Sequence, residues 1–263
     1  MTDFGLAEPY VAVMKGVILS IAPDVSLVDL THAIPPQDVH RAAFLLSTTV
    51  DHFPADTVHV VVVDPGVGSE RRPIAVQTGR ACFVAPDNGV LTLALRRQRA
   101  GVIIHLTNSD YWLPEVSATF HGRDIFAPVA AYLALGVPIN DLGDPVDDIV
   151  RLPAAEPVRE PDGGVQGRVQ HIDRFGNCIT NVPAYMLRLD TPYIVKVAGS
   201  SIRGISPTYV AVEFGIPLSL IGSSGFLEIA VSGGNAAEQL GVDVDDTVLV
   251  VPTKTPGLWN SLG

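Results

Sequence analysis

The segment Thr57-Val-His-Val-Val-Val-Val63 is followed directly by Asp64-Pro-Gly-Val-Gly-Ser-Glu-Arg-Arg72. A continuous β-branched run is typical of a strand buried on both faces of a parallel sheet. A carboxylate at the carboxyl end of such a strand points toward the crevice where open α/β sheets bind ligands. Gly66 and Gly68 let the backbone approach a ligand closely. From this local pattern alone, Asp64 is equally well interpreted as a residue that favours the turn after a strand.

The sequence before residue 155 alternates between helical and strand patterns. Apolar periodicity and capping residues predict helices over 9–21, 38–47, 87–99 and 123–135, and strands over 26–30, 57–63 and 102–106. Strands that alternate with helices favour an α/β domain with a mostly parallel central sheet between helices. We expect this domain over residues 1–155.

The helical pattern nearly disappears beyond that point. Residues 156–164 contain Pro157, Pro161 and the pair Gly163-Gly164, which is typical of a linker. Short β-rich segments separated by turns then predict a small all-β, barrel-like domain over residues 165–263, either an antiparallel barrel or a sandwich. These segments are 165–172, 193–197, 218–221, 226–231 and 247–251.

Composition narrows the possible partners. Seventeen basic and 28 acidic residues give a net charge of −11, which argues against nucleic acid or an anionic membrane as the main partner. Apolar stretches are too short to span a bilayer. Two cysteines, Cys82 and Cys178, make a disulfide framework unexpected, and with no signal-peptide pattern we expect a cytoplasmic protein. No His, Asp and Glu set has metal-ligand spacing, so we expect no metal.

Three further segments contain residues that could take part in catalysis or ligand binding. Asp3, in Thr2-Asp3-Phe4-Gly5, follows what looks like a strand end, although almost nothing precedes it. Either a first strand is absent from this sequence or the sheet edge is built differently. His121 precedes a predicted helix, where its charge state can be tuned. Asp173, Phe175 and Asn177 combine an aromatic face with an amide, which suits a purine. Each segment also has a purely structural interpretation. Asp3 could cap or form a turn, His121 could be a structural histidine with its hydrogen bonds made, and the segment from Asp173 to Asn177 could be a hairpin turn.

Six ordered segments together resemble one family, the S-adenosyl-L-methionine (SAM) hydroxide adenosyltransferases, which are relatives of the fluorinase and chlorinase. The segments span almost the whole chain: MTDFGL (1–6), DPGVGSERR (64–72), APDNG (85–89), TFHGRDIFAPVAA (119–131), IDRFGNCITN (172–181) and SSGFLEIAVSGGNAA (223–237). The resemblance implies an N-terminal α/β domain, a C-terminal β-barrel and a homotrimer with sites between subunits. It also implies hydrolysis of SAM to adenosine and L-methionine without metal or redox cofactor.

The resemblance assigns residues to roles. It implies that Asp64, Arg71 and His121 act on water, with Arg72 the less favoured choice for the arginine. Asp3 would hold the ribose. Contacts with adenine and methionine would come from Asp173, Phe175, Asn177, Ser223, Glu228, Asn235 and Ala236, with Asp173 and Glu228 near the amino-acid end of SAM.

Two other functions remain open at this point. Halide-dependent adenosyl transfer would give a 5′-halo-5′-deoxyadenosine. The halogenating relatives carry tyrosine at the position of Asp64, and an anionic Asp64 should repel a halide by a few kcal/mol. Gly122 also leaves the site without the hydroxyl that the fluorinase has there. A non-catalytic sensor that binds SAM or adenosine is the second alternative.

Overall fold

The structure is a computed structural model that describes residues 1–153, 156–188 and 191–253, and its chain divides into two compact units, Met1–Pro153 and Ala154–Gly263. Part of the segment expected to be a linker is instead a strand of the second unit. Val158 and Arg159 form β6, which pairs with the start of β7 (Val165–Ile172). The Pro and Gly residues of that segment therefore belong to a hairpin turn as well as to a connection.

The first unit contains a five-stranded sheet in the order β1-β3-β2-β4-β5. Its strands are β1 (Thr57–Val60), β2 (Pro73–Thr78), β3 (Ala81–Pro86), β4 (Ala100–His105) and β5 (Asp144–Pro145). Only β1 and β3 are parallel neighbours within this order, whereas β3–β2, β2–β4 and β4–β5 are antiparallel. The expectation of a mostly parallel sheet is therefore wrong, and the sheet is mixed.

The connection between β2 and β3 explains the mixed sheet. Only Gly79 and Arg80 lie between them, and the Thr78 hydroxyl caps the turn by accepting from the Ala81 N–H at 3.0 Å. Parallel neighbours need a crossover of a dozen or more residues, whereas two residues are enough for a hairpin. Neither strand of this hairpin is among the strands predicted from the sequence.

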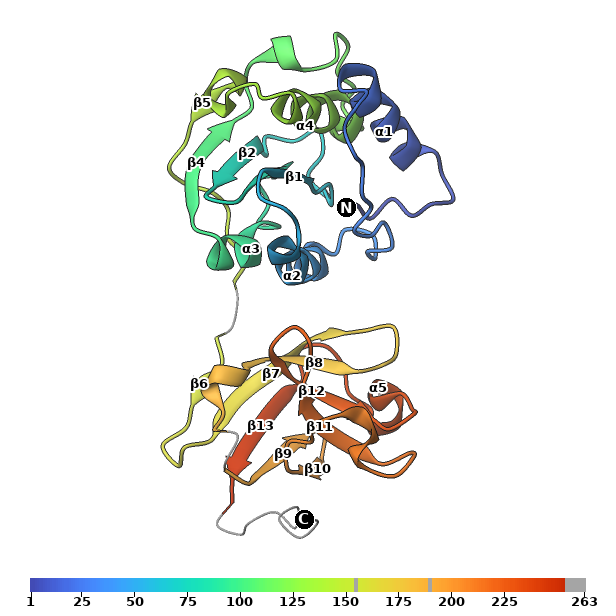
Figure 1. Cartoon of the computed structure of the whole chain (residues 1–263), viewed down its shortest axis with the longest axis vertical. Coiled ribbons are helices and arrows are strands. Elements are labelled where there is room, and N and C mark those ends of the chain that lie inside the picture. Colours follow the sequence, from blue (N-terminus) through green and yellow to red (C-terminus); the bar gives the residue numbers. More distant parts are fainter. Residues whose placement is uncertain (154–155, 189–190, 254–263) are drawn as a thin grey trace. The chain divides into compact units, whose positions relative to one another are not determined.

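Helices cover both faces of the sheet (Figure 1). One face carries α1 (Tyr10–Ile21) and α4 (Ala127–Ala134), and the other carries α2 (Val39–Thr49) and α3 (Thr92–Arg97). Asp38 caps α2 by accepting from the Arg41 N–H at 2.8 Å. The predicted helix over 123–135 is split, because a π-helical turn, η3 (Gly122–Phe126), precedes α4. Residues 26–30, predicted as a strand, form no regular element.

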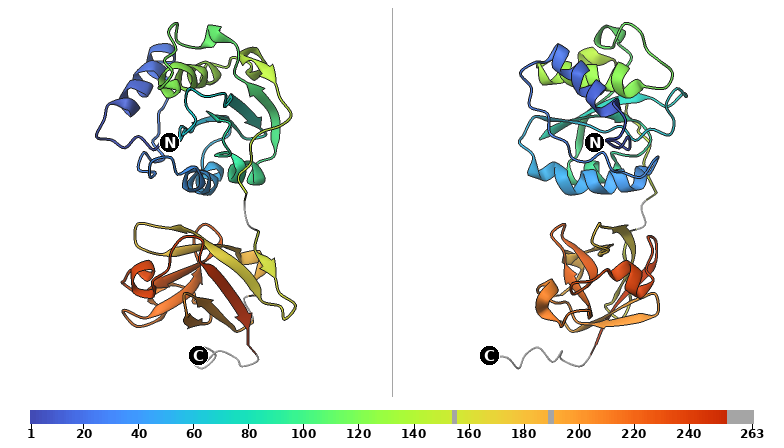
Figure 2. Two further views of the ribbon diagram at one scale, coloured as in Figure 1. Left: turned by 180° about the vertical axis from the view of Figure 1, so that it is seen from behind. Right: turned by 90° about the vertical axis from the view of Figure 1, so that its right-hand side faces the viewer.

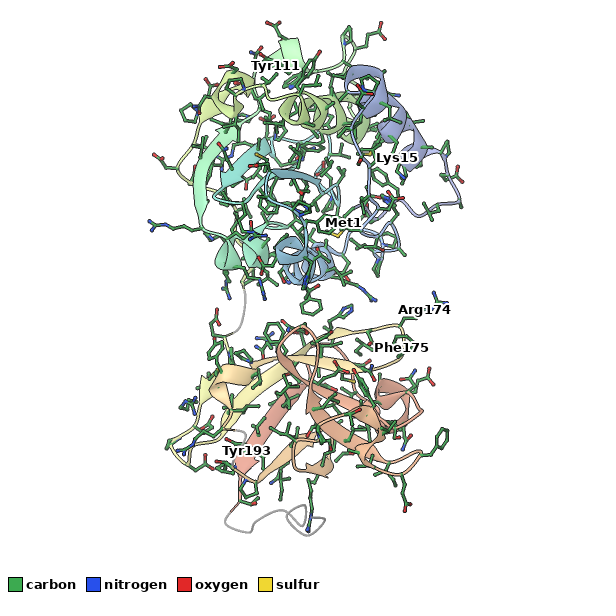
Figure 3. The ribbon with its side chains drawn as sticks, viewed as in Figure 1. Met1, Lys15, Tyr111, Arg174, Phe175 and Tyr193 are labelled. Carbon is green, nitrogen blue, oxygen red and sulfur yellow. The ribbon has the colours of Figure 1, made fainter. Side chains whose placement is uncertain are left out.

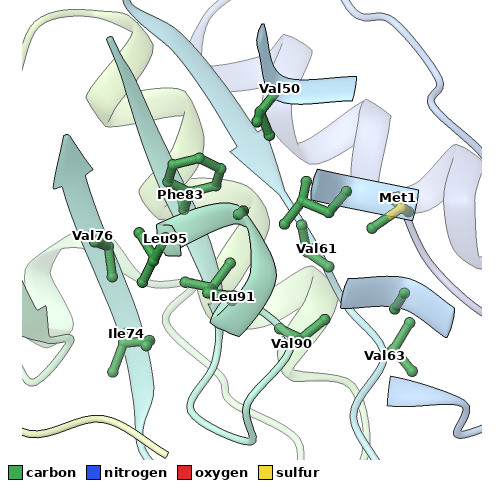
Figure 4. Close-up of a cluster of buried hydrophobic side chains, with 14 of the residues drawn as sticks. Met1, Val50, Val61, Val63, Ile74, Val76, Phe83, Val90, Leu91 and Leu95 are labelled. Carbon is green, nitrogen blue, oxygen red and sulfur yellow. The ribbon is translucent and has the colours of Figure 1, made fainter. Parts of the chain in front are cut away.

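The run after β1 divides its side chains between two cores, as an extended chain must. Val61 and Val63 lie in the cluster under α2 and α3, near Phe83 (Figure 4), and Val62 lies in the cluster under α1 and α4. Because both faces are covered, every position in this run is apolar. The run thereby fixes Asp64, the next residue, at the end of a buried extended segment.

The amino-terminal residues lie beside this segment. The Met1 amino group donates to the Val60 carbonyl at 2.8 Å, the Val62 N–H donates to the Met1 carbonyl at 2.9 Å, and Thr2 forms a parallel bridge with Val62. The edge of the sheet is thus built from residues 1–2, which deliver Asp3 to the same end of the sheet as Asp64.

The second unit is all-β and nearly closed, as predicted (Figure 2). Its strands run β10-β9-β13-β7-β8-β12-β11, all antiparallel, with β6 beside β7. Besides β6 and β7, they are β8 (Cys178–Pro183), β9 (Tyr193–Val197), β10 (Ser200–Arg203), β11 (Pro217–Ile221), β12 (Phe226–Val231) and β13 (Thr247–Pro252). A bridge between Ser206 and Leu220 brings the two ends of the sheet together. The one described α-helix of this unit is α5 (Ala236–Leu240). No helix among the described residues is long and apolar enough to cross a bilayer.

Candidate active site

Asp64 and Arg71 form a buried ion pair at the end of the β1 segment. The Arg71 Nε donates to Oδ1 and Oδ2 of Asp64 at 2.8 and 3.0 Å, and its Nη2 also donates to Oδ2. The two side chains are 5% and 9% exposed, and the guanidinium lies 5.2 Å from the ring centroid of Phe126. Such a two-pronged, charge-assisted contact fixes the carboxylate in orientation as well as in charge.

The loop between these residues can have its shape only with glycine at position 68. Gly68 has φ +76°, and a Cβ there would come within 2.4 Å of the Ala118 carbonyl oxygen. The loop is closed further by the Val67 N–H, which donates to the Asp64 carbonyl at 3.2 Å. Close packing on residue 118 therefore holds the loop against the segment that leads to His121.

His121 reaches the ion pair from the start of η3. Its Nδ1 lies 3.0 Å from the Arg71 Nη2. A guanidinium can only donate, so Nδ1 is the acceptor and the imidazole proton resides on Nε2. Burial lowers the pKa of His121, and the Arg71 charge lowers it further, against the opposing effect of Asp64 and Asp124. The neutral imidazole that this hydrogen bond requires is thus the favoured form.

Arg71 keeps one nitrogen unused. Its Nη1 is buried and has no hydrogen-bond partner among the described residues. A guanidinium donor in that state carries a cost in free energy unless a further group binds it. It is therefore a ready donor for an oxygen atom next to Asp64 and His121.

Arg72 has a different role in the fold. Its Nε and Nη2 donate to Asp87 Oδ2 at 3.0 and 2.6 Å, and its Nη1 and Nη2 donate to the Asp148 side chain and carbonyl. Asp87 in turn accepts from the Val150 N–H. Arg72 therefore ties together three segments of the first unit, while Arg71 alone joins Asp64 and His121.

Asp3 is held on a turn beside the β1 segment. Its Oδ2 accepts from the Gln37 N–H at 2.7 Å. The turn is supported by Thr2, whose hydroxyl pairs with His32 Nδ1 at 2.9 Å and accepts from the Phe4 N–H at 3.2 Å. The second carboxylate oxygen of Asp3 has no hydrogen-bond partner among the described residues.

In the second unit, Asp173 organises the turn between β7 and β8. Its Oδ1 accepts from the N–H groups of Phe175 and Asn177 at 2.8 and 2.9 Å, and its Oδ2 accepts from Asn177 Nδ2 at 3.0 Å. Phe175, at the rim of this unit, is 76% exposed (Figure 3). The turn thus presents an aromatic face to solvent beside a rigid set of polar groups.

Asn235 lies directly under this turn. A Cβ on Gly176 would overlap its side chain, and Asn235 caps α5 by accepting from the Glu238 N–H at 3.1 Å. Ala236, which is fully buried, follows it. The Ala237 N–H donates to the Gly176 carbonyl at 3.0 Å, so the start of α5 and the Asp173 turn form one rigid assembly.

Glu228, on β12, is a buried carboxylate that has no basic partner within the part of the chain that the structure describes. It is 5% exposed and accepts at 2.6 Å from the hydroxyl of Tyr209, on the 3-10 turn η6 (Tyr209–Ala211). Burial raises the pKa of Glu228, and the charge of Asp173 raises it further. Its Oε2 would touch a Cβ on Gly222, and Gly222 is the residue that precedes Ser223 in the chain.

Asp173, Phe175, Asn177, Asn235 and Ala236 therefore gather at one end of the barrel. Ser223 lies in the β11–β12 turn, beside the other end of β8, where the Ala184 N–H donates to the Gly225 carbonyl at 2.9 Å.

A cavity of about 290 Å³ lies elsewhere in the first unit. It is lined by α1, β1 and residues 26–30, and Met1 and Thr2 border it. None of Asp64, Arg71 and His121 lines it. The part of the chain that the structure describes holds no group of three His, Cys, Asp or Glu side chains suited to a metal ion.

Comparison with known proteins identifies the family. Residues 1–143 match the SAM hydroxide adenosyltransferase N-terminal domain, and residues 167–249 match the C-terminal domain of the same family. The chain belongs to the SAM hydroxide adenosyltransferase family. Its two matched ranges fall one in each compact unit.

Relatives of this family member agree with the assignment. An (R)-S-adenosyl-L-methionine hydrolase of Thermus thermophilus is 43% identical over 92% of this chain and 94% of its own length. A fluorinase of Nocardia brasiliensis is more distant, at 28% identity over 90% of each chain. A crystal structure of an uncharacterized conserved protein from Thermotoga maritima has a TM-score of 0.90 and 38% identity, covering 95% of this chain and 98% of that one.

Two residues of this family member escaped the sequence analysis. Tyr209 lies 19 positions before its partner Glu228, in a loop with no distinguishing motif. Asp124 lies within the quoted HGRD segment, but its burial and its contacts with Ser117 appear only in the folded chain. The presence of a charged residue directly after Gly122-Arg123 in an apolar helix was the one available signal for it.

Proposed function

We propose that this protein hydrolyses SAM to adenosine and L-methionine. The observation that carries the proposal is the contact chain from Asp64 through Arg71 to His121. In the reaction, a water oxygen forms a bond to C5′ and the C5′–S bond breaks. Its electron pair remains on sulfur, which becomes the neutral thioether of methionine, and one proton is released. The leaving group needs no acid, so the protein has only to supply and position the nucleophile.

Asp64 is the base in this proposal. The imidazole of His121 has its acceptor nitrogen occupied by Arg71, so it can donate from Nε2 but not accept. Each oxygen of the Asp64 carboxylate retains lone pairs beyond its bonds to Arg71. Water becomes strongly acidic as its oxygen bonds to C5′, so a carboxylate in contact with it can take the proton late in the step.

Arg71 and His121 stabilise the oxygen nucleophile. The unpaired Nη1 of Arg71 is a fixed positive donor in a site that is largely closed to solvent. Such prearranged donors favour the charge that develops on the attacking oxygen. The Nε2–H of His121 is the second donor. Holding the water in line with the C5′–S bond supplies the remaining advantage.

The second unit supplies the proposed substrate contacts. Phe175 and Asn177 suit a purine ring and its polar edge, and Asn235 and Ala236 border the same end of the barrel. Ser223, in the β11–β12 turn, is a further proposed contact. The carboxylates of Asp173 and Glu228 suit the ammonium of the methionine part. Asp3, with its free oxygen, suits the ribose hydroxyls. These roles are supported by the family resemblance and by the burial and contacts of each residue.

We also propose a homotrimer with its sites at subunit interfaces. Large apolar side chains near the proposed contacts, such as Tyr10 at 47% and Phe175 at 76% exposure, are consistent with surfaces that a partner or substrate covers. Light scattering during size-exclusion chromatography tests the oligomer: a mass of one subunit would contradict it. The proposed reaction draws on no cofactor, since no electrons are transferred.

Oxygen-18 water tests the reaction itself. Incubation of SAM with the protein in this solvent should give adenosine two mass units heavier, and methionine without the label. Methanol or S-adenosylhomocysteine would indicate attack at the methyl carbon instead. Intact SAM after hours, with tight binding by calorimetry, would favour a sensor. Halogenated nucleoside formed with added fluoride or chloride would favour halide transfer.

A further inference from the structure

Asp124 occupies an unusual place for a charged residue. Its side chain is fully buried in η3, three positions after His121. A buried carboxylate costs free energy unless hydrogen bonds and a counter-charge compensate it. Asp124 has both, because Ser117 donates to Oδ2 from its N–H and its hydroxyl, each at 2.9 Å, and Arg123 pairs with both carboxylate oxygens.

These contacts shape the segment that carries His121. The Ser117 hydroxyl accepts from the Phe120 N–H at 3.1 Å while it donates to Asp124, and the Asp124 carbonyl accepts from the Leu113 N–H at 2.9 Å. Residue 118, between these anchors, packs its carbonyl against Gly68. The loop from residue 113 to 120 is thus fixed to η3 at one side and to the Asp64 loop at the other.

We propose that Asp124 is a positioning residue that sets both the orientation and the charge state of His121. Its hydrogen bonds to Ser117 hold the turn on which the imidazole approaches Arg71. Its negative charge opposes the effect of the Arg71 charge on the imidazole. The effect on rate rests on the proposed function, whereas the effect on His121 does not.

The charged groups around His121 are few. Arg71 and Asp64 face His121 from the loop that joins them, and Asp124 acts from the turn that follows His121. The ammonium of Lys15, on the neighbouring helix α1, pairs with Asp29, and the ring of Tyr132, on α4, packs on Tyr111. Arg123, on the same turn, pairs with Asp124. Asp124 is therefore the acidic group that can be altered without touching the Asp64–Arg71 pair.

Two matched variants separate charge from structure. Asp124→Asn keeps the shape and an acceptor for Ser117 but removes the charge. Ser117→Ala removes the two hydrogen bonds of the hydroxyl, to Asp124 and from the Phe120 N–H, and keeps the charge. The ring signals of His121 are followed by NMR titration of the whole protein, with His121→Gln for assignment. Asp124→Asn should lower the apparent pKa of His121, because it removes the nearby negative charge. Ser117→Ala should leave it in place while reducing kcat through a displaced imidazole.

A third variant covers the case in which Asp124→Asn fails to fold. Arg123→Gln changes a side chain that is 36% exposed and leaves the Asp124 charge uncompensated, so it should raise the apparent pKa of His121. A lower apparent pKa of His121 in Asp124→Asn together with a higher one in Arg123→Gln supports the proposal. If Asp124→Asn does not fold, the higher pKa in Arg123→Gln supports it alone. A His121 titration that stays at the wild-type pH in folded Asp124→Asn or Arg123→Gln protein would overturn it, whatever the fate of the hydrolase activity.

Discussion

Arg71 donates from one nitrogen, Nε, to both carboxylate oxygens of Asp64, and from Nη2 to Nδ1 of His121. One planar cation thus fixes the position of an anion and the tautomer of an imidazole at the same time. Asp64, Arg71 and His121 thus act as one unit, so the effects of substituting two of them on activity or stability should not be additive.

Asp64→Asn should lower kcat by about 10²–10⁴-fold, because the amide cannot take a proton from water and its NH₂ group faces the Arg71 donors. Steady-state assays of adenosine release measure this. Circular dichroism and thermal unfolding are the control for folding. Undiminished turnover in a folded Asp64→Asn protein would remove Asp64 from the mechanism.

Exchange of each neighbouring arginine for lysine should give opposite results. Arg71→Lys loses the two-pronged contact with Asp64 and the donor to His121, so kcat should fall by at least about 100-fold. Arg72→Lys weakens contacts with Asp87 and Asp148, so its main effect should be a lower melting temperature. A larger loss of kcat in Arg72→Lys than in Arg71→Lys would reverse the assignment.

His59 should make the protein less stable in acid. His59 is 4% exposed, and its Nε2 has no hydrogen-bond partner among the described residues. Burial, aided by the charge of the terminal amino group, lowers the pKa of His59 to about 4. Between pH 6.5 and 4 the unfolded chain therefore binds more protons than the folded one, so stability falls as the pH falls, by up to about 3 kcal/mol.

Substitution of His59 isolates this contribution. His59→Phe keeps a ring against Phe83, with which His59 now stacks at 5.2 Å, but cannot titrate. Urea unfolding at pH 8 and pH 5 should show a smaller acid loss in the variant than in the wild type. Equal losses in both proteins would mean that His59 is not the group responsible.

Two glycines offer a matched test of whether the shape of the loop between Asp64 and Arg71 matters for activity. Gly68→Ala would place a methyl group 2.4 Å from the Ala118 carbonyl oxygen, which should cost about 1–3 kcal/mol and displace Asp64 from His121. Gly79→Ala, in the β2–β3 turn, meets nothing within 4 Å and should change neither the melting temperature nor kcat. Similar behaviour of the two variants would show that the loop tolerates displacement.

Phe175→Ala should raise the KM for SAM by about tenfold, the equivalent of a base–aromatic stacking contact. Because the ring is 76% exposed, the melting temperature should change little. Tyr185→Ala removes a ring that is 86% exposed in the same unit and serves as the control. An unchanged KM in Phe175→Ala would exclude stacking on this ring.

Local pattern was sufficient for much of the fold. β7 and β9 have the bounds that the alternating β-rich segments predict, 165–172 and 193–197, and α1 ends at Ile21 as its periodicity indicates. The direction of the strands in the first sheet was not predictable in this way. It depends on the two-residue β2–β3 turn, and Gly79-Arg80 is not one of the strong hairpin signals.

The choice between Arg71 and Arg72 illustrates what a motif leaves open. Neighbouring residues of an extended segment point to opposite sides, so one faces His121 and the other faces Asp87. Which is which depends on how the loop meets β2. The pairing of Tyr209 with Glu228 was equally inaccessible, since it joins a loop to a strand only after the barrel has formed.

The π-helical turn at residues 122–126 winds with about one more residue per turn than the α-helix α4 that follows it. Removal of one residue there would allow regular winding through to α4 and would rotate the imidazole by about 100° around the axis. Such a deletant would be expected to gain stability and lose its chemistry.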